Sequence, residues 1–413
     1  MNVTGIAMAD APPSTGSSKK ALILVTGLFF LWGVANNLND ILIPHFRNVF
    51  RLSDLQSGLV QSAFYLGYFC FAIPASLTMI RFGYKAAVIT GLGLFATGAA
   101  LFWPAALAIS YPMFLLALFV IASGLAFLET SANPMIASLG RPEDAERRLN
   151  FAQSFNPLGS ITGLAMGTYL ILPATAGGGT EAVRNVLVPY SIIALIVLVW
   201  ALLLARTRFP AVATEERETH PLSDFGALLR RPAYLFGVFA QFAYVGAQVG
   251  VWSFLIRYVG SALPHLSQRD AAKLVIVSLV LFILGRFSGT ALLTRMRGGP
   301  LMMVYGAIGT LLCVIGALVG GPVGVAALVA TSFFMSIMFP TIFVLTLRGL
   351  GPLTKSGAAL IVMAIIGGAA FTALMGLISD TTHSIATAML VPAGCFAIVA
   401  LFAASHLRDR FAQ

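Results

Sequence analysis

Long apolar stretches alternate with short polar breaks along almost the whole chain. Apolar runs of about 20 residues are typical of helices that cross a bilayer. The breaks hold glycine, proline and charged residues, as in Arg81-Phe82-Gly83-Tyr84-Lys85. The pattern therefore predicts an all-α membrane protein with twelve spans, at approximately 21–46, 54–80, 84–108, 111–139, 147–172, 185–207, 232–260, 268–295, 299–320, 322–349, 354–380 and 383–405.

The longest polar connection divides these spans into two sets of six. It runs from Arg206 to Arg231 and includes Glu215-Glu216-Arg217-Glu218. Six spans, a charged linker and six further spans are the layout of a two-bundle transporter. We find no strong residue-level repeat between the halves, so the symmetry rests on the number of spans. The expected parts are a disordered tail (1–20), an N-terminal six-helix bundle (21–207), a linker (208–231), a C-terminal six-helix bundle (232–405) and a short tail (406–413).

Composition supports a membrane protein. Hydrophobic residues make up 58% of the chain and charged residues 10%, whereas soluble proteins carry about 25% charged residues. The net charge of +10 raises the question of a nucleic-acid partner. If the N-terminus is cytoplasmic, however, eighteen of the 25 Lys and Arg residues lie on the inner side and six on the outer side. This bias follows the positive-inside rule, so we expect both termini in the cytoplasm and no nucleic-acid partner.

Two carboxylates lie within predicted spans. Asp40 belongs to the first span and Glu129 to the fourth. Asn36 precedes Asp40 by four residues and Asn133 follows Glu129 by four, so each pair shares a helix face. Carboxylates at membrane depth are costly and usually functional, because they can carry a proton or accept hydrogen bonds from hydroxyl groups. The alternatives are that Asp40 caps a helix or reaches the outer interface, and that Glu129 is a hydrogen-bonded packing residue.

Amide and aromatic side chains provide a second set of candidates. Gln153 and Asn156 share a face of the fifth span, where Pro157 interrupts the backbone hydrogen bonds. Amides donate and accept hydrogen bonds, which suits a polyhydroxylated ligand. The seventh span presents a face that fits a sugar site, although interhelical hydrogen bonding explains it equally well. That face consists of Gln241, Tyr244, Gln248 and Trp252.

Other residues carry weaker signals. Arg286 is a lone cation in the eighth span, where it could act as a gate or counter-ion or extend to the inner interface. The five histidines, including His45, lie at expected span ends or in loops, so a carboxylate is the better proton carrier. The three scattered cysteines predict neither a disulfide framework nor a metal site. A membrane-embedded enzyme or sensor would need a catalytic pair or a soluble domain, and we find neither.

Several motifs resemble the L-fucose/proton symporter family of the major facilitator superfamily. Bacterial glucose/galactose and related hexose carriers share much of the likeness, which covers nearly all of the membrane region. The motifs are Phe29-Phe30-Leu31-Trp32-Gly33, Asn37-Leu38-Asn39-Asp40, Gln61-Ser62-Ala63-Phe64-Tyr65, Leu128-Glu129-Thr130-Ser131-Ala132-Asn133-Pro134, Leu149-Asn150-Phe151-Ala152-Gln153-Ser154-Phe155-Asn156, Gln241-Phe242-Ala243-Tyr244-Val245-Gly246-Ala247-Gln248 and Pro340-Thr341-Ile342-Phe343.

This resemblance implies the major facilitator fold and proton-driven import of L-fucose or a related hexose by alternating access. Asp40 would carry the coupling proton together with Glu129, and Asn37, Glu129, Gln153 and Asn156 would contact the sugar. The expected protein is a monomer of the bacterial inner membrane, surrounded by lipids, with the proton as coupling ion and no cofactor. The alternatives are a glucose, galactose or mannose transporter of the same family, or a drug or metabolite exporter of the same fold.

The chain also departs from the family pattern. The loop at residues 81–85 lacks the Asp usual in the superfamily. Met338 precedes Phe339-Pro340 where the family pattern predicts a polar residue, which leaves the identity of the sugar open.

Overall fold

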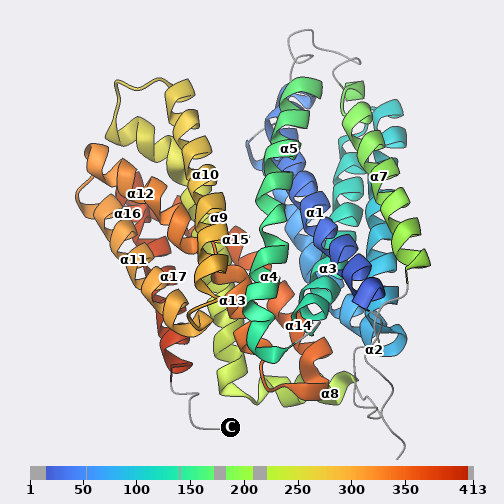
Figure 1. Ribbon diagram of the computed structural model, residues 1–413. Coiled ribbons are helices and arrows are strands. Elements are labelled where there is room, and N and C mark those ends of the chain that lie inside the picture. The colour runs from blue at the N-terminus through green and yellow to red at the C-terminus, as the bar shows by residue number, and fades with distance from the viewer. Residues whose placement is uncertain (1–14, 53, 139–140, 172–182, 208–220, 408–413) are drawn as a thin grey trace, which may run out of the picture.

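A computed structural model describes residues 15–52, 54–138, 141–171, 183–207 and 221–407, and within these ranges the chain forms helices and no strand. The helices gather in two bundles, one blue to green and the other yellow to red in Figure 1. The first bundle consists of α1 (Thr15–Phe50), α2 (Asp54–Leu107), α3 (Tyr111–Ser138), α4 (Ala145–Gln153), α5 (Phe155–Leu170) and α7 (Leu187–Arg206). The second consists of α9 (Pro232–Ala262), α10 (Gln268–Leu292), α11 (Gly298–Leu318), α12 (Gly321–Met335), α13 (Met338–Leu347), α14 (Thr354–Met363), α15 (Gly367–Thr382), α16 (Ile385–Ala388) and α17 (Leu390–Ser405).

The short helix α8 (Pro221–Leu229) lies between the bundles at the lower end of the molecule in Figure 1. We call this end the linker end.

These helices account for twelve membrane crossings. Within the described ranges, nine helical stretches are long and apolar enough to cross a membrane. The 54 residues of α2 would extend about 80 Å, far more than the ~30 Å hydrocarbon core. Gly83, with φ 83° and ψ 171°, breaks α2 into two crossings. The first crossing is α1, and α4 and α5 together form the fifth.

The ends of the first crossing and of the linker differ from the sequence prediction. α1 begins at Thr15, so residues 15–20 are helical rather than part of a disordered tail. No proline interrupts the chain between Thr15 and the apolar run, so the helix continues into the polar residues. Residues 1–14, 208–220 and 408–413 lie outside the described residues, and α8 occupies part of the expected linker.

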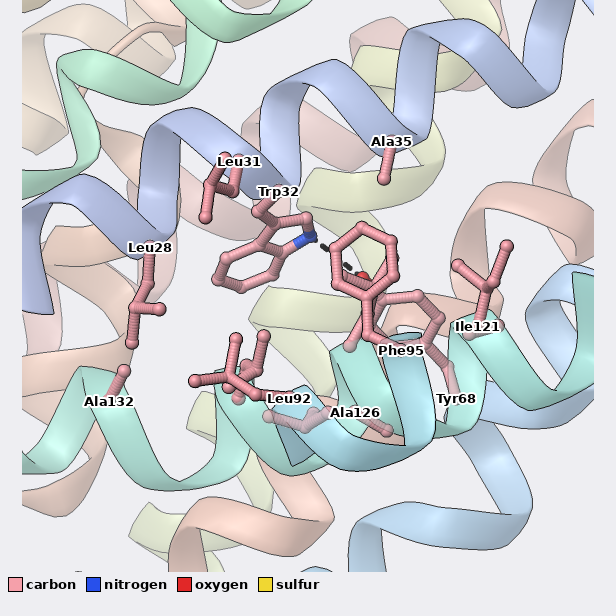
Figure 2. Packing of buried hydrophobic residues seen from close by; sticks show 14 of the residues in the cluster. Leu28, Leu31, Trp32, Ala35, Tyr68, Leu92, Phe95, Ile121, Ala126 and Ala132 are labelled. Carbon is pink, nitrogen blue, oxygen red and sulfur yellow. Dashed lines mark hydrogen bonds between the residues drawn. The ribbon is translucent and has the colours of Figure 1, made fainter. Parts of the chain in front are cut away.

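Each bundle has its own apolar core. Figure 2 shows part of the first core, where Leu28, Leu92 and Phe95 pack around Trp32. The indole Nε1 of Trp32 donates a hydrogen bond of 2.8 Å to the hydroxyl oxygen of Tyr68. Buried Trp and Tyr side chains usually pair their polar atoms in this way. The bond fixes α1 against α2 and holds both rings in place.

Glycines bring α1 and α5 into backbone contact. A Cβ atom on Gly33 would lie 1.9 Å from the carbonyl oxygen of Asn156, and one on Gly159 would lie 2.0 Å from that of Phe30. Small residues allow such close approach between membrane helices. The contact places the amide residues of α1 beside Asn156 of α5.

Candidate functional site

A cavity of about 600 Å³ lies between the two bundles. The first bundle supplies a mostly polar wall and the second a mostly apolar one. The first wall consists of Asn36, Asn37, Gln61, Tyr65, Tyr68, Glu129, Gln153, Asn156, Pro157 and Ser160, with Phe29, Trp32 and Phe64. The second consists of Val245, Val249, Val275, Leu279, Phe282, Phe339 and Ile365, with Gln248, Trp252, Ser253 and Arg286.

Glu129 on α3 is the acidic side chain on this wall among the described residues. It is only 3% exposed. Within the described part of the chain, its carboxylate has no hydrogen bond or ion pair, although Tyr68 lies close enough to interact with it electrostatically. A buried carboxylate without a partner is costly, so the packing alternative considered from the sequence has no support here. Its position on the cavity wall leaves it free to bind a proton or a ligand.

The amide of Gln153 is fixed on both sides. Its Nε2 donates to Oδ1 of Asn133 at 3.0 Å, and its Oε1 accepts from Nη1 of Arg286 at 3.2 Å. Asn156 and Asn37 also line the cavity, and Nδ2 of Asn37 donates to the Gly33 carbonyl at 3.3 Å. The cavity therefore brings together Asn37, Glu129, Gln153 and Asn156, whose contact with the sugar stays a prediction.

Arg286 joins two broken helices, one in each bundle. Its Nε donates to the carbonyl oxygen of Ser336 at 2.6 Å, and its Nη1 to that of Gln153 at 3.2 Å. In a regular helix these carbonyls would accept from residues 340 and 157, but both of these are prolines and have no N–H. The guanidinium therefore binds the carbonyl freed at the α4–α5 break and the one freed at the α12–α13 break.

This position settles one question left open by the sequence. Arg286 is 4% exposed and stacks on the ring of Phe282 at 4.8 Å, so it does not extend to the inner interface. We find no carboxylate paired with it among the described residues. Its partners are the two freed carbonyls and the Gln153 amide, which span the space between the bundles.

The face of α9 is only partly on the cavity wall. Gln248 and Trp252 line the cavity, and Nε1 of Trp252 donates to Oγ of Ser332 at 3.1 Å. Gln241 and Tyr244, predicted to line it too, are 0% exposed and are not among the lining residues. The spacing does place all four on one face, but that face is longer than the cavity. Gln241 and Tyr244 lie nearer the linker end, where the bundles pack together.

Asp40 and His45 lie in the second half of α1, toward the end away from the linker. The backbone of Asp40 belongs to α1, but its side chain lies outside the described residues. His45 lies five residues before the end of α1 and is 0% exposed. Its burial was not predicted from the sequence.

The polar face of α2 was missed. Gln61, Tyr65 and Tyr68 line the cavity, and their spacing of four and three residues places them on one helix face. That spacing is visible in the sequence and could have identified them.

Bonds between the bundles cluster at the linker end. Glu146 on α4 is 6% exposed; its Oε1 accepts from Nη2 of Arg348 at 2.5 Å and its Oε2 from the N–H of Gly298 at 2.7 Å. Nδ2 of Asn150 donates to Oγ1 of Thr341 at 3.2 Å. These bonds hold the bundles together on the linker side of the cavity.

The model of the Major Facilitator Superfamily matches residues 24–372 of this chain. The chain belongs to the major facilitator superfamily. It is 44% identical to the L-fucose-proton symporter of Escherichia coli (strain K12) over 94% of each protein. It is 38% identical to the glucose/galactose transporter of Brucella abortus biovar 1, over 92% of this chain and 93% of that protein.

Solved structures of the superfamily agree with the fold. A crystal structure of the transporter FucP in an outward conformation superposes with a TM-score of 0.87 at 44% identity, covering 94% of this chain and 99% of that one. The proton:xylose symporter XylE, 14% identical with a TM-score of 0.71, shares the fold. These comparisons confirm the resemblance to the L-fucose/proton symporter family and the expected twelve-helix, two-bundle architecture.

Proposed function

We propose that this chain is a proton-coupled symporter that imports L-fucose or a related hexose by alternating access. The relatives with 36% to 44% identity include two L-fucose-proton symporters, from Escherichia coli and Haemophilus influenzae. They are transporters rather than enzymes, in line with the expectation from the sequence.

The observation that carries the proposal is the polar wall around Glu129. An ionised carboxylate is a strong acceptor for sugar hydroxyls, and the neighbouring amides of Gln153 and Asn156 both donate and accept. The cavity volume of about 600 Å³ is typical of small-molecule sites. Trp32 and Trp252 offer rings against which the apolar face of a pyranose would pack. A hydroxyl-rich cargo with one apolar face fits this arrangement.

Proton coupling is assigned to Asp40 and Glu129. A proton is the only coupling ion proposed, and no cofactor is needed. In this account, the two bundles move relative to each other when both the proton and the sugar are bound. The movement closes one end of the cavity and opens the other. The cluster around Glu146 would close the cytoplasmic end in the state described here, which is therefore outward-facing. The likeness to a crystal structure in an outward conformation supports this assignment.

The surroundings of the protein follow from the same proposal. The helices cross the bacterial inner membrane in contact with lipid, both termini are cytoplasmic, and the working unit is a monomer. The charge bias between the two sets of loops supports this orientation. No nucleic acid takes part.

A glucose, galactose or mannose transporter is the main alternative, since the Brucella abortus relative is named for glucose and galactose. An exporter of amphipathic compounds is less favoured, because the first-bundle wall is lined by amides and a carboxyl group. A thermal-stability assay separates sugar transporters from such exporters. Sugars should protect a purified sugar transporter from heat, and lipophilic cations should protect an exporter.

The substitution Asp40→Asn tests the coupling. Without an ionisable group at this position, sugar counterflow down its own gradient should persist, while uphill uptake driven by a proton gradient should be lost. Reconstituted vesicles with and without a pH gradient provide the measurement. If the variant still concentrates sugar, Asp40 does not carry the coupling proton.

A further inference from the structure

The polar faces that line the cavity continue below its floor toward the linker end. On α3, Asn133 lies one turn beyond Glu129; on α4, Asn150 lies one turn beyond Gln153. On α9, the corresponding residues below Gln248 are Tyr244 and Gln241. These four side chains, Asn133, Asn150, Gln241 and Tyr244, come from both bundles, and each is 0% exposed. We call them the lower polar set.

Much of the hydrogen-bonding capacity of the lower polar set is unused. Among the described protein atoms, no partner exists for Nδ2 of Asn133, Oδ1 of Asn150, the hydroxyl of Tyr244 or either amide atom of Gln241. Buried polar groups without partners are costly, and more so where no water is present. Apolar side chains of similar size would pack here without that cost, so packing alone does not explain these residues.

The half-helix α13 contacts both the cavity and members of the lower polar set. Phe339 lines the cavity on one side, and its ring contacts that of Tyr244 at a centroid distance of 6.2 Å. Thr341, two residues further on, accepts the hydrogen bond from Asn150. α13 therefore contacts members of the set in both bundles, and a movement of α13 relative to α4 and α9 would uncover them.

We propose that the lower polar set is a second, transient sugar-binding site, which forms the inner half of the transport route. When the linker end opens, its free amide and hydroxyl groups bind water and the hydroxyl groups of the departing sugar. This proposal rests on the proposed sugar transport. It assigns to Gln241 and Tyr244 a role in sugar release, in place of the substrate-binding role predicted from the sequence.

The first test compares two leucine substitutions on the same face of α9. Gln241→Leu should leave the sugar concentration for half-maximal heat protection within about twofold of the unsubstituted protein, because Gln241 does not line the cavity. Its counterflow rate should fall about tenfold, equivalent to 1.4 kcal/mol, through loss of hydrogen bonds to the passing sugar. Gln248→Leu, on the cavity wall, should instead weaken protection. An unchanged counterflow rate in Gln241→Leu would overturn the proposal.

A second measurement applies even if Gln241→Leu does not fold. Single cysteines are placed at Gln241 and, as a control, at Ala243, after replacement of Cys70, Cys313 and Cys395. Both positions are 0% exposed on α9, but Ala243 points the opposite way. A small charged thiol reagent should modify Gln241→Cys when sugar is present and the protein cycles, and should not modify Ala243→Cys. If the reagent modifies neither cysteine while the protein cycles, the proposal is contradicted.

The two proposals fail in different ways. If the unsubstituted protein shows neither heat protection nor counterflow with any hexose, the proposed function is wrong. If it transports sugar but Gln241 is neither reactive as cysteine nor needed for turnover, only the inner site is wrong.

Discussion

Replacement of Arg286 by lysine probes the contact that joins the two broken helices. Arginine binds both freed carbonyls because its Nε and Nη1 point at different acceptors within one planar group. The single ammonium group of lysine keeps the charge but cannot reach the Ser336 and Gln153 carbonyls in the same way. The substitution Arg286→Lys therefore removes at least one charged hydrogen bond between the bundles.

The expected effect follows from the strength of that bond. A hydrogen bond to a charged group contributes about 1.5–3 kcal/mol. Because the bond to Gln153 crosses between the bundles, it stabilises the linker-closed state over any state in which the bundles part there. Its loss should shift the equilibrium toward the linker-open state on the order of ten- to a hundredfold. The Gln153 amide also loses the hydrogen bond from Arg286 that orients it, so the sugar affinity should fall.

Distances across the linker end report this equilibrium. Spin labels at Phe82 and Met296 are suitable because these residues are 63% and 43% exposed, one in each bundle near that end. Pulsed electron resonance in Arg286→Lys should show a larger population of long distances than in the unsubstituted protein. The exposed Cys70 is replaced by serine in both.

The control is Arg257→Lys. Arg257 stacks on Phe254 at 5.1 Å, much as Arg286 stacks on Phe282 at 4.8 Å, but it is exposed. Loss of the stacking contact alone should leave the distances unchanged. If Arg286→Lys gives the same distance distribution as Arg257→Lys and binds sugar as tightly, the contact between the broken helices does not hold the linker end closed.

Two further predictions concern the helix contacts. Gly33→Ala should lower the unfolding temperature and the sugar affinity, because the added Cβ would lie 1.9 Å from the Asn156 carbonyl oxygen and overpacking costs about 1–3 kcal/mol. Gly93→Ala is the control, because its added Cβ would meet no neighbouring atom within 4 Å. Equal unfolding temperatures for the two variants would contradict the contact between Gly33 and Asn156. Glu146→Gln should increase the population of long distances across the linker end, because it replaces the ion pair with Arg348 by a hydrogen bond to a neutral amide. Distances identical to those of the unsubstituted protein would refute this role of Glu146.

The sequence predicted the crossings and part of the cavity wall for physical reasons. An apolar run of about 20 residues predicts a membrane-spanning helix, and helical periodicity determines which side chains share a face. Glu129, Gln153, Gln248 and Trp252 were found in this way, and the cavity contains all of them.

What the sequence left open depends on contacts between distant segments. Periodicity places Gln241 on the same face as Gln248, but only the packing of the bundles determines where the cavity ends. The prolines at positions 157 and 340 each predict a freed carbonyl, yet no local rule indicates that Arg286 binds both. The buried position of Glu146 similarly depends on residues about 150 and 200 positions away in the chain.

Uptake into proteoliposomes tests the central claim most directly. Purified protein is supplied with a panel of hexoses and 6-deoxyhexoses, with and without a proton gradient that is acidic on the outer side. The account predicts that L-fucose or a related hexose accumulates above its external concentration only when the gradient is present. The account is contradicted if a sugar accumulates equally with and without the proton gradient. It is also contradicted if no sugar in the panel is transported.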